Sequence, residues 1–134
     1  MRYMFLIYGD ERAREAMSPE ERHHNMTKAQ AMMDEANRQG VFVGADPLRP
    51  TNTATTIRKH DGRVMITDGP FAETKEQLAG YIILDCKDLD EALEWATKFP
   101  GPCGGAGCVE IRPIGTFAEI AGEKTPEVTS KAHG

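Results

Sequence analysis

The sequence predicts an α+β domain in which two helices cover one face of a sheet. Residues 2–8 and 80–86 are apolar at both alternating sets of positions, which is typical of strands covered on both faces. Apolar residues recur at helical spacing in residues 18–40 and 88–99. The dipeptide Asp61-Gly62, a strong hairpin signal, lies between these two halves. The predicted order is therefore β-α-β, a β-hairpin, and β-α-β.

The first helix is expected to begin after Ser18 and to end at Gly40. Ser18 is suited to the N-cap, Pro19 to the first helical position, and Glu21 to the capping-box position. Gly40 favours the conformation that ends a helix. The apolar residues at helical spacing are Met26, Ala29, Met33 and Ala36.

The central segments predict strands separated by turns. A short strand is expected at 41–44, and a loop at 46–50 because two prolines interrupt a regular ladder. Residues 53–59 and 64–67 are expected to form the two strands of the hairpin.

The second helix is expected to begin after Asp88, with Glu91 at the capping-box position. Pro100 and Gly101 end it, and 108–112 alternates as a final strand. The predicted domain spans residues 1–116, and 117–134 is expected to be a polar, mobile tail. The predicted buried stripe of this helix is Leu89, Ala92, Leu93, Ala96 and Phe99.

Two helices cover only one face of the predicted sheet, yet strands 2–8 and 80–86 are apolar on both faces. The simplest cover for the second face is another copy of the same sheet. The pattern therefore predicts a two-fold homodimer.

The composition of the chain limits which binding partners and which cellular compartment we expect. The 134 residues suggest one domain, and the net charge of −5 without a basic cluster argues against direct nucleic-acid binding. The apolar N-terminal run is short and acidic residues follow it, so we expect a strand rather than a signal peptide or membrane span. Three irregularly spaced cysteines fit a reducing cytoplasm better than a disulfide framework.

The stretch TDGPFAETKEQ, residues 67–77, is the main candidate site. Asp68 accepts hydrogen bonds readily and Gly69 permits a positive φ, so a plain turn is one interpretation. A turn explains Phe71 less well, and loops on a rigid sheet often carry function. Asp68 is therefore a candidate acid–base or ligand-orienting group, and Phe71 a candidate ligand contact.

Charged and polar neighbours extend this hypothesis. Lys75, and Arg58 in strand 53–59, are candidates for binding an anion, and Thr56 shares a strand face with Arg58. The alternative is an exposed charged loop and an arginine that merely extends to solvent.

Histidine and cysteine residues give weaker signals. His23 lies beside the apolar stripe of the first helix, either as a boundary residue or as a ligand contact. Cys103 and Cys108 lack the two further ligands that structural zinc needs, which favours a flexible lead into the last strand over a regulatory thiol pair. No metal site and no cofactor are expected.

The segments TDGPFAETKE, GYIIL and DEALEWA together resemble the DGPF branch of the YCII-related proteins, over roughly residues 1–115. The resemblance implies a small bacterial homodimer with an antiparallel, ferredoxin-like α+β fold of the dimeric α/β-barrel type. It also implies a functional link to extracytoplasmic-function sigma factors, beside which DGPF proteins often lie. A few relatives act on chlorinated muconolactones, and a His–Asp acid–base pair has been proposed in the wider family.

The chain departs from that family pattern at the histidine. Counting back from Gly40, Ala29 stands at about the place of the family's His, which leaves the acid–base pair incomplete. Two functions therefore remain open. One is Asp-based chemistry on a small anionic or cyclic metabolite in a cleft near the dimer interface. The other is a non-enzymatic binding or regulatory module linked to a sigma factor.

Overall fold

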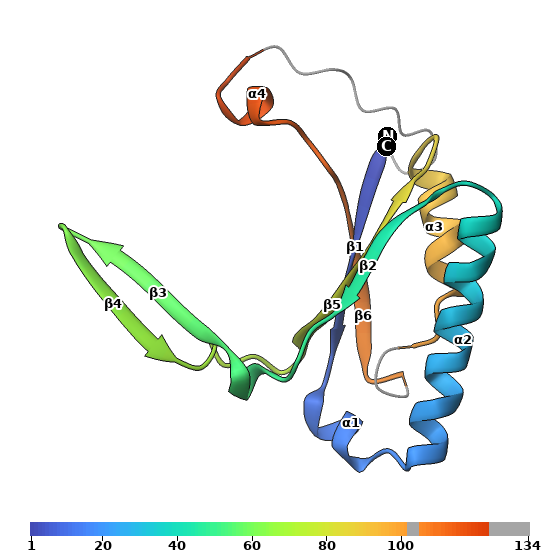
Figure 1. Cartoon of the computed structure of the whole chain (residues 1–134), viewed down its shortest axis with the longest axis horizontal. Helices are drawn as coiled ribbons and strands as arrows, with labels where there is room; N and C mark the ends of the chain where they lie inside the picture. The colour runs from blue at the N-terminus through green and yellow to red at the C-terminus, as the bar shows by residue number, and fades with distance from the viewer. Residues whose placement is uncertain (102–104, 124–134) are drawn as a thin grey trace.

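The body of the molecule is one antiparallel sheet with two helices on one face. The computed structural model describes residues 1–101 and 105–123. Strands β1 (Arg2–Gly9), β2 (Phe42–Pro47), β5 (Gln77–Asp85) and β6 (Gly107–Pro113) form a sheet in the order β2-β5-β1-β6. Helices α2 (Pro19–Arg38) and α3 (Leu89–Lys98) lie side by side against it (Figure 1). This order is ferredoxin-like, so the predicted fold class is confirmed.

The core lies between the sheet and the helices. Strand register pairs Tyr3 with Leu84 and Phe5 with Ile82, and all four side chains are buried. The same register places Met4 and Leu6 on the opposite, open face, where they are half-buried. The buried cluster consists of Tyr3, Phe5, Met32, Ala36, Ile82, Leu84, Cys86, Ala92 and Trp95.

Both predicted helix starts are confirmed. Ser18 Oγ accepts a hydrogen bond from the Glu21 amide at 3.1 Å, and Asp88 Oδ1 accepts one from the Glu91 amide at 2.9 Å. The predicted stripe of α3 was incomplete because it omitted Trp95, whose side chain is buried while the Lys98 ammonium lies 4.4 Å from its ring centroid. The wide indole ring reaches the core from the border of the stripe.

The second strand is longer than predicted, and the expected loop at 46–50 was wrong in its first two residues. β2 continues through Asp46 to Pro47, which pairs with Gly80 of β5. β2 is an edge strand with β5 as its one neighbour. Because an edge strand leaves one side unpaired, the missing N–H of a proline is tolerated there.

The hairpin forms an arm that stands away from the body. We call residues 55–68 the arm, which comprises β3 (Thr55–His60) and β4 (Arg63–Asp68) as a separate two-stranded sheet. It projects from the body on the side away from α2 and α3 (Figure 1). Asp61 and Gly62 take φ of 48° and 76°, so the predicted Asp-Gly turn is confirmed. A 3₁₀ turn, η1 (Thr51–Thr53), leads into it.

Two short helices were not predicted. α1 (Glu11–Ala16) begins where Asp10 accepts a hydrogen bond from the Arg12 amide at 2.9 Å. α4 (Phe117–Ile120) begins where Thr116 accepts one from the Glu119 amide at 3.2 Å. α4 lies in the segment that was expected to be a tail, whose remainder from residue 124 is outside the described residues.

Candidate functional site

A cleft opens between α2 and the sheet edge formed by β2 and β5. Its volume is about 580 Å³, within the roughly 300–1,000 Å³ range of small-molecule sites. Helix α2, strands β2 and β5, and Phe99 after α3 contribute its walls. The lining residues are Ile7, Met26, Ala29, Gln30, Met33, Asp34, Asn37, Phe42, Ala45, Asp46, Pro47, Ala79, Gly80, Tyr81, Ile82 and Phe99.

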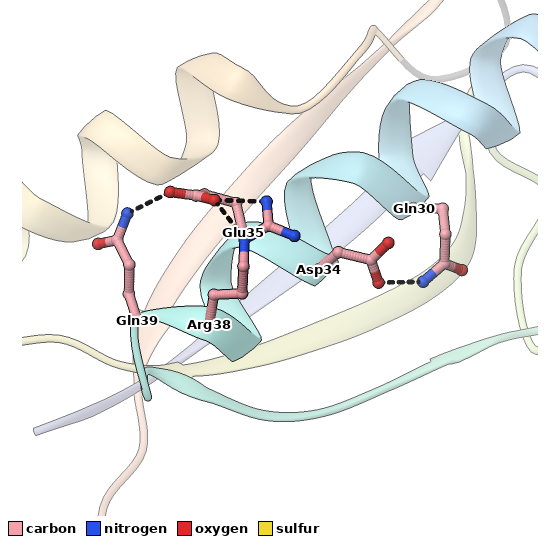
Figure 2. A network of polar contacts seen from close by, with 5 residues as sticks. All are labelled: Gln30, Asp34, Glu35, Arg38 and Gln39. Atoms are coloured by element: carbon pink, nitrogen blue, oxygen red, sulfur yellow. Dashed lines mark hydrogen bonds and ion pairs between the residues drawn. The ribbon is translucent and has the colours of Figure 1, made fainter.

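One face of α2 supplies three of the polar side chains of the cleft: Gln30, Asp34 and Asn37. They fall on one face because residues three and four apart on a helix are neighbours. Gln30 Nε2 donates a hydrogen bond to Asp34 Oδ1 at 2.9 Å (Figure 2). The bond holds these two side chains together, so an oriented amide–carboxylate pair lies at the wall.

A second polar pair, Tyr81 and Asp46, lies on the open face of the sheet, because Tyr81 is the ladder partner of Leu6. The two residues are direct partners in the β2–β5 ladder, and the Tyr81 hydroxyl donates to Asp46 Oδ2 at 2.6 Å. This hydrogen bond raises the pKa of the Tyr81 phenol above its ordinary value. Both residues border the cleft, but the strand register directs their side chains to the face of the sheet opposite α2. Sequence reasoning missed this pair because Asp46 was assigned to a loop.

Among the described residues, the lining of this cleft contains no Lys, Arg or His. Arg38, on the last turn of α2, instead pairs with Glu35 at 2.5 Å (Figure 2). Gln39 also donates to Glu35, and these two partners lower the pKa of its carboxyl, the Gln39 hydrogen bond most of all. The charge of Arg38 is therefore engaged on α2 itself.

Asp68 lies outside the cleft, at the end of β4, and is exposed. It is the ladder partner of Thr55, so its side chain shares an arm face with Ile57 and Ile66. Thr56 and Arg58 project from the opposite face of the arm. The structure of the chain does not bring Asp68 together with these two residues.

The remaining sequence candidates also lie away from the cleft. Thr56 Oγ1 donates to the Gly69 carbonyl at 2.8 Å, which fixes the turn after β4. Phe71 is 76% exposed, and Lys75 is exposed in the same turn. His23 is exposed near the start of α2. Gly69 adopts a φ of 102°, as the turn interpretation of residues 68–70 requires.

The thiols show no arrangement for catalysis or metal binding in the described part of the chain. Cys86 is free and buried, and burial raises its pKa to about 11. Cys108 is free and exposed, and its Sγ lies 3.4 Å from Glu76 Oε2. Cys103 lies outside the described residues. Within 1–101 and 105–123, no three His, Cys, Asp or Glu side chains are grouped to hold a metal, and no helix has the length and apolarity to span a membrane.

A comparison with models of known protein families shows to which family the chain belongs. The model of the YCII-related domain matches residues 1–118. The chain belongs to the YCII-related family. This YCII-related chain is also 38% identical over 117 residues to an uncharacterised protein of Rhizobium meliloti (strain 1021). That match covers 87% of the present chain and 94% of the relative.

A solved structure shows the same fold. The YCII-related chain is similar to 5-chloro-2-hydroxyhydroquinone dehydrochlorinase (TftG) from Burkholderia phenoliruptrix AC1100, solved in complex with 2,5-dihydroxybenzoquinone. The TM-score is 0.50 at 11% sequence identity, over 85% of this chain and 93% of that one. At this identity the likeness establishes the fold alone.

Proposed function

We propose that this protein binds a small cyclic molecule in the cleft between α2 and the β2–β5 edge. The observation that carries the proposal is the cleft itself, which combines a volume of about 580 Å³ with mainly apolar walls and one oriented polar pair, Gln30 and Asp34. Apolar walls accommodate a ring, and a few fixed polar groups orient it. The dehydrochlorinase of the same fold was solved with a cyclic ligand, which is consistent with this use of the fold.

In this proposal the protein acts as a homodimer. The open face of the sheet carries Met4, Leu6 and Ile83, which no helix in the described part of the chain covers. The arm exposes Ile57 at 59% and Ile66 at 68% on one face. A lone two-stranded hairpin is marginally stable in water, so its apolar face needs a cover. A second copy of the chain covers this apolar face through a self-complementary, two-fold interface, and the cleft lies near that interface.

Binding without catalysis is the form of the proposal that the cleft supports better. Among the described residues, its lining contains neither a His nor a Cys, and Asp34 is the titratable side chain that α2 presents to it. A regulatory role beside an extracytoplasmic-function sigma factor fits such a binder, given the resemblance of residues 67–77 to the DGPF branch. The free thiols of Cys86 and Cys108 support a reducing compartment such as the cytoplasm.

Catalysis by Asp68 is the second candidate. Asp68 shares its arm face with Ile57 and Ile66, the face that a second copy would cover in the proposed dimer. Contact with that copy would desolvate the carboxylate, which a useful base requires. Arg58 or Lys75 would bind an anionic group in this version, together with Thr56, Phe71 or His23.

A matched pair of variants tests binding at the cleft. Ala29 lines the cleft, whereas Ala31 is exposed two positions along the same helix. A library of small cyclic compounds is screened by thermal shift against the protein, Ala29→Leu and Ala31→Leu. We expect ligands that stabilise the protein and Ala31→Leu but not Ala29→Leu. Ligands that stabilise all three equally would contradict the cleft as the site.

Turnover separates the two candidate functions. The ligands found in this screen are incubated with the protein and with Asp68→Asn, and product is measured by mass spectrometry. The binding proposal predicts no product with either protein. Product that is formed by the wild type and lost in Asp68→Asn, with ligand binding retained, would establish catalysis instead.

A further inference from the structure

We propose that the cleft continues toward the start of α2 into a second hollow, and that this hollow binds the anionic group of an elongated ligand. The proposal rests on the proposed function: the ring of the ligand stays in the cleft, and a chain carries its negative charge into the second hollow. Arg14 and Arg22 line that hollow and are the residues that bind the anionic group.

The second hollow adjoins the cleft along α2. Its volume is about 190 Å³, and α1 and the start of α2, which contribute to its walls, lie together at one end of the sheet (Figure 1). Because the two spaces share wall residues, one ligand can occupy both. The residues that line both spaces are Ile7, Met26, Ala29, Pro47, Ala79 and Phe99.

Helix geometry directs Arg22 toward the side of α2 that faces the sheet. Arg22 precedes Ala29 by seven positions, which is nearly two turns, so their directions around the helix differ by only about 20°. Ala29 is buried and lines the cleft, so Arg22 continues the same stripe toward the start of the helix. Asn25 lies on this stripe too, is half-buried, and adds an amide to the lining of the second hollow.

The charge of Arg22 is not used within the described part of the chain. None of its ion pairs includes this residue. The α2 residues three and four positions away are the usual partners of a helical arginine. For Arg22 none of them is acidic, so the helix itself provides no partner. They are Ser18, Pro19, Asn25 and Met26.

Arg14, in the last turn of α1, is also without an ion pair among the described residues. Two acidic residues precede it by four and three positions, but both carboxylates are engaged elsewhere. Asp10 accepts a hydrogen bond from the Arg12 amide at 2.9 Å, and Glu11 accepts one from the Thr51 amide at 2.9 Å. Two unpaired guanidinium groups therefore border one hollow.

The charges along the groove favour an anion at the arginine end. Among the described residues, the lining of the second hollow contains no Asp or Glu. Asp34 lines the cleft twelve positions after Arg22, which is about 18 Å along the helix. This separation exceeds the Debye length of about 8 Å at physiological ionic strength, so Asp34 hardly repels an anion beside the arginines. The planar guanidinium group matches the geometry of a carboxylate.

The separation of the two spaces sets the length of the ligand. Met33 lines the cleft but not the second hollow. It follows Arg22 by eleven positions, so its Cα lies about 16 Å further along α2. A ring beside Met33 needs a chain of several atoms to bring its anionic group within reach of the arginine side chains. The ligand class is therefore a ring that carries an anionic group on a flexible chain.

Three probes share a phenyl ring and differ at the chain. Phenylbutyrate carries a carboxylate at the end of its chain, phenylbutanol carries an uncharged hydroxyl there, and phenylacetate carries the carboxylate on a shorter chain. Each is titrated into the ¹⁵N-labelled protein, and shifts of the backbone amides along α1 and α2 are followed by NMR.

We expect phenylbutyrate to shift amides near both Met33 and Arg22. Both arginines are exposed, so we expect phenylbutyrate to bind about fivefold more tightly than phenylbutanol, the factor of a favourable exposed ion pair. Phenylacetate should bind more weakly than phenylbutyrate, because its chain cannot span the two spaces. The preference for phenylbutyrate over phenylbutanol should decrease as salt is raised from about 0.02 to 0.5 M.

Charge-removing variants connect that preference to the arginines. Arg14→Gln and Arg22→Gln each remove one charge from the second hollow. Lys28→Gln is the control, because this exposed α2 residue lines neither space and its loss changes the net charge equally. We expect each arginine variant to reduce the preference for phenylbutyrate over phenylbutanol about twofold, and the double variant to abolish it. Lys28→Gln should leave it unchanged, and Arg22→Lys should retain most of it.

Each other outcome overturns a defined statement. Phenylbutanol that binds at the cleft as tightly as phenylbutyrate refutes the anionic end while leaving the cleft as the binding site. A preference that persists in the double arginine variant refutes the role of Arg14 and Arg22. Phenylbutyrate shifts that are confined to amides of α1 refute a ligand that spans both spaces. No shift with any of the three probes at millimolar concentration refutes the proposal together with the proposed function.

Discussion

Gly80 allows β2 to approach β5 closely beside the cleft. A Cβ atom at this position would lie 2.8 Å from the Asp46 carbonyl oxygen and 3.1 Å from the Pro47 Cα. Ordinary contacts begin at 3.4 Å, so β2 would have to retreat by about 0.6 Å, the difference between 3.4 and 2.8 Å. Backbone atoms cannot rotate away as a side chain does, so we expect Gly80→Ala to strain the cleft wall.

The loss of stability expected for Gly80→Ala is the difference between two opposing effects. Overpacking of this kind costs about 1–3 kcal/mol, and the reduced freedom of the unfolded chain returns about 0.4–1 kcal/mol. The net loss is therefore about 1–2 kcal/mol, which corresponds to a melting temperature roughly 4–7 °C lower for a chain of this size. Thermal unfolding followed by circular dichroism measures this change in melting temperature.

Gly44 is the matched control for Gly80. It lies in β2, and a Cβ there would meet no atom within 4 Å. Gly44→Ala should therefore leave stability unchanged or raise it by about 0.4–1 kcal/mol. Equal melting temperatures for the two variants would refute the close approach of β2 at Gly80. Gly80 lines the cleft, so a Gly80→Ala protein should also bind ligand more weakly.

The remaining predictions concern stability. The buried Tyr3 hydroxyl has no hydrogen-bond partner among the described residues, so Tyr3→Phe should leave stability in urea unfolding unchanged or raise it by up to about 1 kcal/mol; a clear loss of stability would contradict this. Burial raises the Cys86 pKa from 9.0 to about 11. Between these pH values the thiol keeps its proton in the folded protein and loses it in the unfolded chain. Stability should fall as pH rises from about 9 to 11, and less so in Cys86→Ala. Glu11 accepts from the Thr51 amide at 2.9 Å; Glu11→Ala should cost about 1–3 kcal/mol and speed exchange of that amide.

Local chemistry made much of the fold predictable. The caps at Ser18 and Asp88 and the turn at Asp61 depend on neighbours within a few residues, so the sequence indicates them directly. Trp95 and the extension of β2 to Pro47 depend on what lies across the core or at the sheet edge. Short-range sequence patterns do not encode those contacts, so the sequence did not predict either feature.

The candidate site was less predictable for a related reason. The cleft joins α2 to β2 and β5, so residues that line it are far apart in the chain, as Gln30 and Gly80 are at 50 positions. Nothing in the local sequence around Asp46 indicates that it faces Tyr81. The resemblance instead directed attention to Asp68 and its neighbours, where turn chemistry and family signature coincide. Only strand register shows that Asp68 and Arg58 project from opposite faces of the arm.

A crystal structure of the protein with a stabilising ligand tests the central claim most directly. The ligand is taken from the screen of cyclic compounds, and its position is read from the electron density. The account predicts density for the ring between α2 and the β2–β5 edge, with a polar group of the ligand within hydrogen-bond distance of Gln30, Asp34 or Asn37. Density beside residues 68–75, with the cleft occupied only by solvent, would contradict it.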